Sequence, residues 1–317
     1  MVLEDESSPD RLIARVASGD SCDGRTIMLD PGRLAGLVAQ RTRSAIDEGA
    51  LQRIETGEEI VEDRGVRFVV RTASSLRRKS VAARLPTAGE TPRNPFLPPE
   101  PALTVAEVSP GHIAVLNKFN VLDGHLLLVT SAFEDQRTLL GPADFAAWCA
   151  CLAEYPGLGF YNGGPEAGAS QSHKHLQIVP LPLSMAEPGV PIAALFGGEG
   201  PACPAIPFAH GFARLRSARA GDLVSVGSEA HALYRRLLAD LGIGAIRRDG
   251  REWQSAPYNL LLTRDWMLVV PRRCESWQGI SINGLGFAGS LFVRHTGELE
   301  RIRRHGPMGV LQTVSGR

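Results

Sequence analysis

The spacing of apolar residues along the chain predicts helices that alternate with short strands. Apolar positions recur every three or four residues over residues 34–46, which is the period of an amphipathic helix. The same period predicts a helix over residues 142–155, with proline early in its first turn. A third helix is expected over residues 228–241, because Ser228 can cap its start and Gly242 can end it. Three helices are therefore available to flank a sheet.

Short apolar runs between these helices predict strands. Two pairs of runs are separated by brief polar linkers, as in β-hairpins, and the linkers contain the sequences VLDG and Arg264-Asp265. The expected strands are residues 65–71, 112–119, 125–130, 157–162, 258–263 and 266–271. We therefore expect antiparallel pairing in at least part of the sheet.

Residues 163–182, with the sequence GGPEAGASQSHKHLQIVPLP, combine a glycine-rich loop with a strand. The small side chains of the first half let backbone N–H groups approach an anion. In the second half, alternation along a strand places His173, His175 and Gln177 on one face. The stretch therefore predicts an anion-binding loop that leads into a strand carrying two imidazoles and a carboxamide. Taken alone, the two histidines are also compatible with a metal-ligand pair or with two surface histidines.

Composition and charge exclude several classes of protein. The 317 residues contain 34 acidic and 34 basic side chains, so no surface for nucleic acid or membrane is indicated. No apolar run approaches the length of a membrane span, and we expect a cytoplasmic protein. The five cysteines contain no C-x-x-C pair, which argues against a disulfide framework or a four-cysteine zinc site. Cys149 and Cys151 are expected to fill the core.

The H-x-H-x-Q motif that ends at Gln177, preceded by G-A-S-Q, resembles the histidine-triad superfamily in its transferase form. It is similar to the dinucleoside tetraphosphate phosphorylases (ATP adenylyltransferases) and, more distantly, to the galactose-1-phosphate uridylyltransferases. The segments NPF, LNKFNV, HLLLVT, YNLLLT and SINGLGFAGS also resemble the phosphorylases. The resemblance covers nearly the whole chain except the first sixty residues and a proline-rich connection near residues 183–207.

The resemblance implies an α+β fold with antiparallel sheets flanked by helices. It divides the chain into an N-terminal catalytic half, residues 1–190, and a C-terminal half, residues 205–317, that completes the nucleotide site. We expect a monomer whose partners are small-molecule nucleotides. No protein-bound cofactor or metal is expected, because no Cys, Asp or Glu near His173 and His175 completes a tetrahedral set. Magnesium is expected only as a companion of the polyphosphate.

The resemblance also implies which residues act. His175 is the expected nucleophile, supported by the carbonyl or the ring of His173, with Gln177 as the third catalytic residue. The residues expected to bind substrate are Lys79, Asn117, Lys118, Asn162, Gly168, Ala169, Ser170, Gln171, Asn283, Gly284, Leu285, Ser290 and Arg294.

The substrate-binding residues have ordinary structural alternatives. Lys79, Lys118 and Arg294 are the candidate cations for the polyphosphate, although each is also compatible with a solvated surface position. Asn162 at a strand end is also compatible with a turn. Ser290 and Arg294 are expected on a helix, where a spacing of four places them on one face.

The chemistry of the motif favours transfer over hydrolysis. A neutral imidazole is a good nucleophile near pH 7, and His175 can attack phosphorus if its other ring nitrogen donates a hydrogen bond. In similar hydrolases a third histidine replaces Gln177, whereas a carboxamide neither delivers nor takes a proton. Together with this chemistry, the resemblance implies reversible phosphorolysis of diadenosine tetraphosphate to ATP and ADP through adenylylated His175. The alternatives are a dinucleoside polyphosphate hydrolase, a nucleotide-sugar uridylyltransferase and a non-catalytic nucleotide sensor; no zinc-binding cysteine pair supports the uridylyltransferase.

Overall fold

The structure is a computed structural model that describes residues 26–73, 94–197, 203–215 and 223–316. The helices are α2 (Leu34–Asp47), α4 (Pro142–Glu154), α5 (Leu223–Asp240), α6 (Gly284–Ala288), α7 (Thr296–His305) and α8 (Pro307–Val314). The strands before residue 200 are β1 (Gly57–Asp63), β2 (Val66–Thr72), β3 (Thr104–Ser109), β4 (His112–Leu116), β5 (Leu126–Thr130), β6 (Gly157–Gly163) and β7 (His175–Pro180). The later strands are β8 (Gly211–Arg214), β9 (Ala245–Arg248), β10 (Arg251–Gln254), β11 (Tyr258–Leu262), β12 (Trp266–Pro271), β13 (Ser276–Trp277), β14 (Ile280–Ser281) and β15 (Ser290–Val293).

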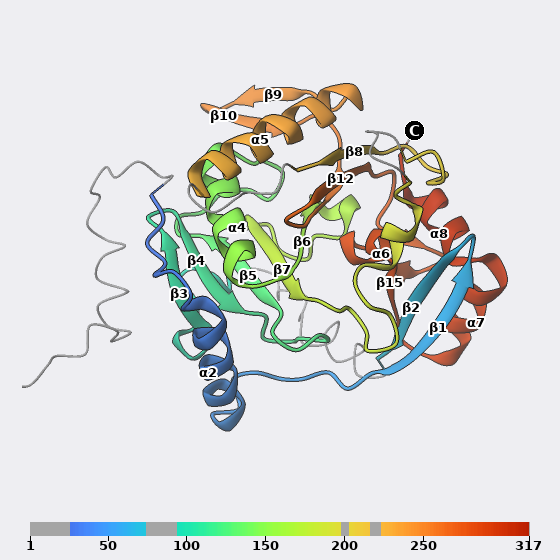
Figure 1. The fold of residues 1–317 in the computed structure, drawn as a ribbon, viewed down its shortest axis with the longest axis horizontal. Helices are drawn as coiled ribbons and strands as arrows, with labels where there is room; N and C mark the ends of the chain where they lie inside the picture. Colours follow the sequence, from blue (N-terminus) through green and yellow to red (C-terminus); the bar gives the residue numbers. More distant parts are fainter. Residues whose placement is uncertain (1–25, 74–93, 198–202, 216–222, 317) are drawn as a thin grey trace, which may run out of the picture.

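One large antiparallel sheet organises the molecule (Figure 1). Eight of the strands that the structure describes form it, in the order β3-β4-β5-β7-β6-β11-β12-β8. Each neighbouring pair is antiparallel. The strand that begins at His175 lies between β5 and β6, near the middle of this sheet. The sheet therefore fixes the histidine strand on both edges.

The two faces of the sheet are covered by different layers. On one face Leu176 and Ile178 of β7 belong to an apolar cluster that includes residues of α2, α4 and α5. On the other face Val179 belongs to a second cluster, which contains β2, α6, α7 and α8. A small third cluster around Phe96 covers β4 and β5 on this second face. His175 and Gln177, which alternate with Leu176 and Ile178, therefore face the side where the second and third clusters meet.

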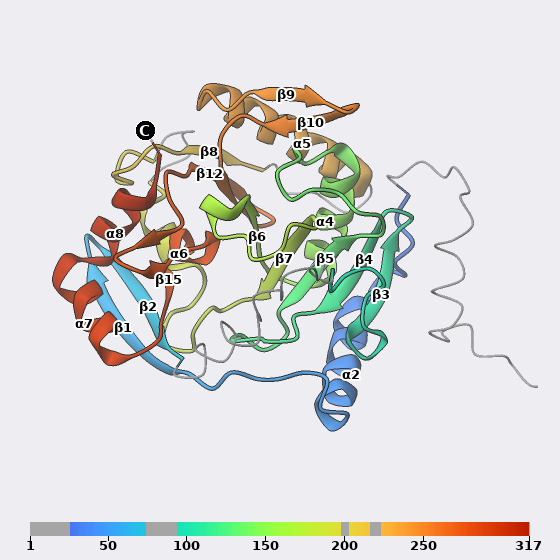
Figure 2. The same ribbon diagram turned by 180° about the vertical axis from the view of Figure 1, so that it is seen from behind.

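A second sheet lies beside the large one and packs against the C-terminal helices α7 and α8 (Figure 2). Its order is β1-β2-β15, with β1 antiparallel and β15 parallel to β2. The buried guanidinium of Arg71 on β2 joins these strands, because it donates to Ser290 Oγ (2.7 Å) and to Glu58 Oε2 (2.8 Å). Among the described helices, none is long and apolar enough to cross a membrane.

Most of the elements predicted from the sequence are confirmed. The structure contains both predicted hairpins, as β4–β5 and β11–β12, and the α+β class with an antiparallel sheet and flanking helices. Cys149 and Cys151 are buried in α4, and burial raises the pKa of the Cys149 thiol to about 12. The division of the chain into two halves stays a prediction; strands from both sides of it share the large sheet.

Two local predictions are wrong. The third helix begins at Leu223 rather than after a cap at Ser228. It includes Gly227, which packs against α4, where an added Cβ would lie 2.7 Å from the Cα of Ala146. Ser290 and Arg294 do not share a helix: Ser290 begins strand β15, and Arg294 follows its end. Parallel pairing with β2 overrides any local helical spacing there.

Candidate active site

His175 is buried at the start of β7, with 4% of its surface exposed. Its ring Nδ1 lies 2.8 Å from the carbonyl oxygen of His173, and a carbonyl can only accept. Nδ1 therefore carries the proton, and the lone pair of the neutral ring is on Nε2. Of the two supports expected from His173, its carbonyl and its ring, the backbone carbonyl is the one that contacts the His175 ring.

His173 is also fixed as a neutral ring. Asn94 places its amide Nδ2, which can only donate, 2.8 Å from His173 Nδ1. Nε2 of His173 lies 2.8 Å from the carbonyl oxygen of Thr130 and therefore donates to it. Burial lowers the pKa of His173, although the hydrogen bond to Thr130 opposes this shift. Phe96, from the NPF segment, packs edge-on against this ring and also contacts His175 at a centroid separation of 5.5 Å.

Gln136 positions the first residue of β7 and was not found from the sequence. It is 1% exposed, and its Oε1 accepts from the backbone N–H of His175 at 2.8 Å. Its Nε2 donates to the carbonyl oxygens of Asn162 (2.9 Å) and His175 (3.3 Å). A glutamine in an irregular segment gives no sequence signal, since its partners lie 26 and 39 residues away.

The third member of the motif, Gln177, contacts a residue that the sequence did not assign to the site. Its Oε1 lies 3.0 Å from Nε2 of His125, which immediately precedes β5. Nδ1 of His125 lies 3.0 Å from Nδ2 of Asn117. Asn117, expected to contact substrate, thus contacts His125 in this structure.

The glycine-rich loop folds as a tight turn. Residues Pro165–Ala167 form a short 3-10 helix that ends at Gly168, whose φ is +91°. The N–H groups of Gly168 and Ala169 donate to the carbonyl oxygens of Pro165 and Gly164, at 2.9 and 3.1 Å. The expectation that these two N–H groups are available for phosphate oxygens is therefore wrong, because they close the turn itself. Ser170 and Gln171 are exposed immediately after it.

Asn162 connects the histidine side of the sheet to the C-terminal elements. Its Oδ1 accepts from Nδ2 of Asn259 (2.8 Å) and from the N–H of Gly284 (2.9 Å). Asn283 caps the N-terminus of α6 by accepting from the N–H of Leu285 at 3.0 Å. An added Cβ on Gly168 would lie 2.9 Å from the Cβ of Asn283. The structure therefore brings Asn162, Gly168 and residues 283–285 together, as the sequence predicted for one site.

A buried arginine that the sequence did not single out underlies this junction. Arg272 is 4% exposed, and burial lowers the pKa of its guanidinium to about 10. It donates to Asn259 Oδ1 (2.6 Å) and to the carbonyl oxygens of Ala167 (3.2 Å) and Ile282 (2.8 Å). One side chain thus fixes β11, the glycine turn and the segment before α6. Its signal in the sequence is weak, since it lies in an arginine pair after a strand.

The predicted cations are not gathered at one point by the described contacts. Lys118 pairs with Glu100 (2.7 Å), and both side chains are partly exposed. The guanidinium of Arg294 bonds Glu298 through Nε (2.8 Å) and donates from Nη2 to the carbonyl oxygen of Gly279 (3.0 Å). Ser290 is buried and accepts from Arg71. Lys79 lies outside the described residues.

A buried charge cluster lies behind the histidines. Lys174, between them in sequence, donates to Glu134 Oε2 at 2.7 Å and lies 3.4 Å from Asp144 Oδ2. Asp144 belongs to α4, and its other oxygen lies 2.9 Å from Nε2 of His112. The cluster ties the catalytic strand to the helix layer on the opposite face of the sheet.

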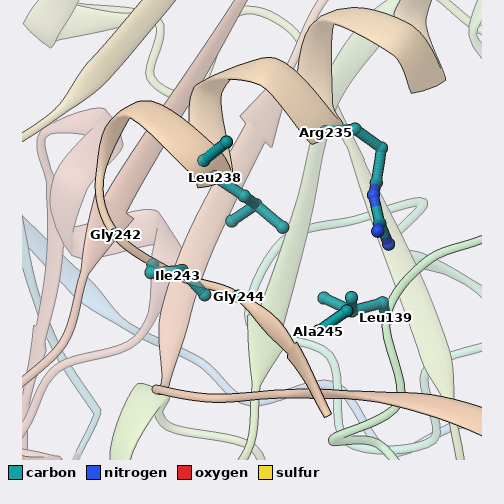
Figure 3. Close-up of a pocket in the computed structure, with 8 residues that line it drawn as sticks. Leu139, Arg235, Leu238, Gly242, Ile243, Gly244 and Ala245 are labelled. Carbon is teal, nitrogen blue, oxygen red and sulfur yellow. The ribbon is translucent and has the colours of Figure 1, made fainter. Parts of the chain in front are cut away.

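A cavity of about 330 Å³ lies apart from these residues (Figure 3). Its lining comes from α5, the segment leading to β9, and Leu139. It contains none of the residues assigned to the site. In the part of the chain that the structure describes, no group of three or more His, Cys, Asp or Glu side chains is placed to hold a metal ion.

Comparisons with known proteins agree with this arrangement. Residues 24–198 match the family described as Ap4A phosphorylase N-terminal domain, and residues 204–316 match the ATP adenylyltransferase C-terminal domain. Diadenosine 5',5'''-P1,P4-tetraphosphate phosphorylase 2 of Saccharomyces cerevisiae is 31% identical over 247 residues, which cover 66% of this chain and 71% of that protein.

Solved structures extend the likeness to the fold. Yeast Ap4A phosphorylase Apa2 in complex with AMP matches 90% of this chain and 97% of its own, at 25% identity and a TM-score of 0.71. The same enzyme in complex with Ap4A matches 90% of this chain and 98% of its own, at 25% identity and a TM-score of 0.70. Family matches over both parts of the chain and structural likeness over nine-tenths of it lead to one assignment: the chain belongs to the Ap4A phosphorylase family, whose C-terminal domain is described as that of ATP adenylyltransferase.

Proposed function

We propose that this enzyme is a nucleotidyltransferase that cleaves diadenosine tetraphosphate with inorganic phosphate, giving ATP and ADP reversibly. The observation that carries the proposal is the contact of His175 Nδ1 with the carbonyl oxygen of His173, which leaves the ring's lone pair on Nε2. The Ap4A and AMP complexes of the yeast relative support the substrate class. His175 is then the residue that carries the adenylyl group.

The reaction proceeds in two displacements at the same phosphorus. In the first, Nε2 of His175 forms a bond to the α-phosphorus of one adenosine, and the bond to the bridging oxygen breaks. The electron pair leaves with that oxygen on ATP. In the second, an oxygen of inorganic phosphate attacks the same phosphorus, ADP forms, and the imidazole recovers its lone pair. The first displacement expels anionic ATP, and the second expels the neutral imidazole, whose proton stays on Nδ1, so neither displacement needs a strong general acid.

Gln177 favours phosphate over water as the acceptor. Water attacks well only when a base takes its proton, and a carboxamide offers none. Phosphate already carries negative charge and needs no such base. The side chain of Gln177 is nevertheless able to hold a phosphate oxygen through its amide N–H groups.

The charge of the polyphosphate requires cations. We propose Lys79, Lys118 and Arg294 for this role, with Ser170 and Gln171 as polar donors at the loop. Lys118 and Arg294 would exchange Glu100 and Glu298 for phosphate oxygens on binding. Mg²⁺ enters on the polyphosphate rather than on a protein site, since this ion prefers substrate phosphates and water.

The remaining expectations concern the context of the enzyme. We propose that it acts as a monomer in the cytoplasm on small nucleotides, and the AMP and Ap4A complexes of the yeast relative support the nucleotide partners. Sedimentation of the purified protein with and without diadenosine tetraphosphate tests the monomer. A stable dimer in either state would contradict it.

Product analysis tests the function directly. With diadenosine tetraphosphate and phosphate, we expect equal amounts of ATP and ADP, and without phosphate only a single turnover to ATP and an adenylylated protein. The adduct should map to His175 and be absent in His175→Ala. His295→Ala serves as a matched control, because its ring is exposed at the start of α7.

Other outcomes select another function. Continued release of ATP and AMP without phosphate would identify a hydrolase. Adenylylation that persists undiminished in His175→Ala would place the nucleophile elsewhere. Tight binding of the substrate without turnover or adduct would identify a nucleotide sensor.

A further inference from the structure

His125 lies against Gln177 but belongs to none of the roles assigned above. Its Nε2 lies 3.0 Å from Gln177 Oε1, and both residues are at least nine-tenths buried. Its ring also packs against Phe160 of β6, with the centroids 5.7 Å apart. His125 is therefore a buried imidazole in direct contact with a motif residue.

The contacts of His125 with Asn117 and Gln177 indicate one direction for these two hydrogen bonds. The chain of contacts begins at the backbone N–H of Phe119, which can only donate, 3.4 Å from Asn117 Oδ1. The other end of the Asn117 amide, Nδ2, therefore faces His125 Nδ1 and donates to it at 3.0 Å. With Nδ1 accepting, the proton of the neutral ring is on Nε2, and His125 donates to Gln177 Oε1.

We infer that His125, held by Asn117, is a positioning residue that orients the Gln177 amide. The oxygen Oε1 of Gln177 accepts from His125. The amide nitrogen Nε2 of Gln177 is therefore the end left to interact with the phosphoryl oxygens. The inference rests on the proposed function, since it concerns the group that Gln177 offers to the transferred phosphate.

The orientation matters because a carboxamide can turn over with little change in shape. Its oxygen and nitrogen ends are nearly equal in size but opposite in hydrogen-bonding character. In the turned orientation the oxygen of Gln177 would face anionic phosphate and repel it. Nothing in Gln177 itself selects the donor end, so a neighbour of fixed direction is needed. The chain from the Phe119 N–H through Asn117 and His125 supplies that direction.

Two substitutions of His125 separate its two ring nitrogens. In His125→Gln the side-chain amide reaches the position of Nε2 and can still donate to Gln177. In His125→Asn the amide reaches only the position of Nδ1, so it keeps the contact with Asn117 and loses the one with Gln177. Both variants are polar, and both lose the ring contact with Phe160. They differ in which hydrogen bond they keep: His125→Gln keeps the donor to Gln177, and His125→Asn keeps the contact with Asn117.

We expect His125→Asn to lower kcat by more than ~10-fold and His125→Gln to keep most of the activity. The upper limit for His125→Asn is the ~10²–10³-fold loss typical when a donor to the reacting group is removed outright. Thermal unfolding of both variants checks that they fold. Equal kcat in the two variants, whether high or low, would overturn the inference.

A double-mutant cycle with Gln177→Ala gives a second measurement. If His125 acts through Gln177, His125→Asn should cause little further loss in the Gln177→Ala background. A loss that persists in full there would show that His125 acts on the fold or on substrate directly, and would overturn the inference. Failure of the proposed function is distinguishable, because the unsubstituted enzyme would then show no phosphate-dependent formation of ADP.

Discussion

His173 illustrates how single residues in this site are fixed by partners of defined donor or acceptor sense. The Asn94 amide donates to Nδ1, and the Thr130 carbonyl accepts from Nε2, so both contacts require the neutral ring. Burial adds to this by lowering the pKa of His173. Because the pKa is lower in the folded protein, His173 stabilises the fold above its unfolded value of about 6.5. That contribution is lost as pH falls through the lowered value.

Replacing Asn94 with aspartate should favour the protonated ring of His173 over the neutral ring. The carboxylate accepts from a protonated Nδ1 and attracts the positive charge of the ring, so we expect the pKa of His173 to rise in Asn94→Asp. Titration of the histidine resonances by NMR measures the shift. His210, whose Nδ1 bonds the carbonyl oxygen of Phe208 elsewhere in the chain, is the internal control. A pKa of His173 that stays unchanged or falls would contradict this account of the site.

At the scale of elements, the contact between α4 and α5 depends on one glycine. Gly227 lies within α5, where glycine is ordinarily unfavourable, yet an added Cβ would lie 2.7 Å from Ala146 Cα and 2.8 Å from Ala146 N. These are backbone atoms of α4 and cannot move aside alone. Glycine is therefore retained for close helix packing, not for flexibility.

We expect Gly227→Ala to lower the free energy of unfolding by ~1–3 kcal/mol, the range for overpacking, although alanine is the better helix former. Gly36→Ala is the matched control. Gly36 lies in α2 with nothing within 4 Å of an added Cβ, so that substitution should stabilise the protein by up to ~1 kcal/mol. Denaturant unfolding measures both. If the free energy of unfolding changed in the same direction in both variants, helix propensity, not packing, would decide the effect.

At the scale of the whole molecule, the buried charges of Lys174 and Asp144 join the catalytic strand to the helix layer. Burial alone would raise the pKa of Asp144, but the charge of Lys174 and the hydrogen bond from His112 outweigh it and hold that pKa well below its ordinary value. A lowered pKa means that Asp144 stabilises the fold above about pH 4, its unfolded value. The stabilisation is lost as pH falls towards the folded value.

Asp144→Asn should therefore destabilise the protein most at neutral pH. We expect the free energy of unfolding to fall by ~3–5 kcal/mol at pH 7, the usual cost of removing one partner of a buried ion pair. The difference from the unsubstituted protein should shrink as pH is lowered below about 4, where the native carboxylate also begins to lose its advantage. Unfolding free energies across pH measure this, with exposed Asp30→Asn as control. A difference independent of pH would contradict the assigned charge of Asp144.

The sequence by itself determined the features that depend on neighbours along the chain. The alternation of His173, His175 and Gln177 with apolar residues predicts the strand and its two faces. The hairpins and the helices of residues 34–46 and 142–155 also follow from local periodicity, as does the burial of Cys149 and Cys151. The backbone support of His175 by His173 was predictable because these residues are two apart.

Only the tertiary structure decided features that join distant segments. Gln136, Asn94 and His125 reach the motif from 39, 79 and 52 residues away. The segments NPF and HLLLVT contain Asn94 and His125, but their local sequence does not indicate these contacts. Residues 290–293 form a strand because β2, more than two hundred residues earlier, pairs with them. Local spacing fixes which side chains can share a face. Hydrogen-bond partners and strand pairing are chosen by the whole fold, since each buried donor or acceptor needs a partner wherever the folded chain supplies one.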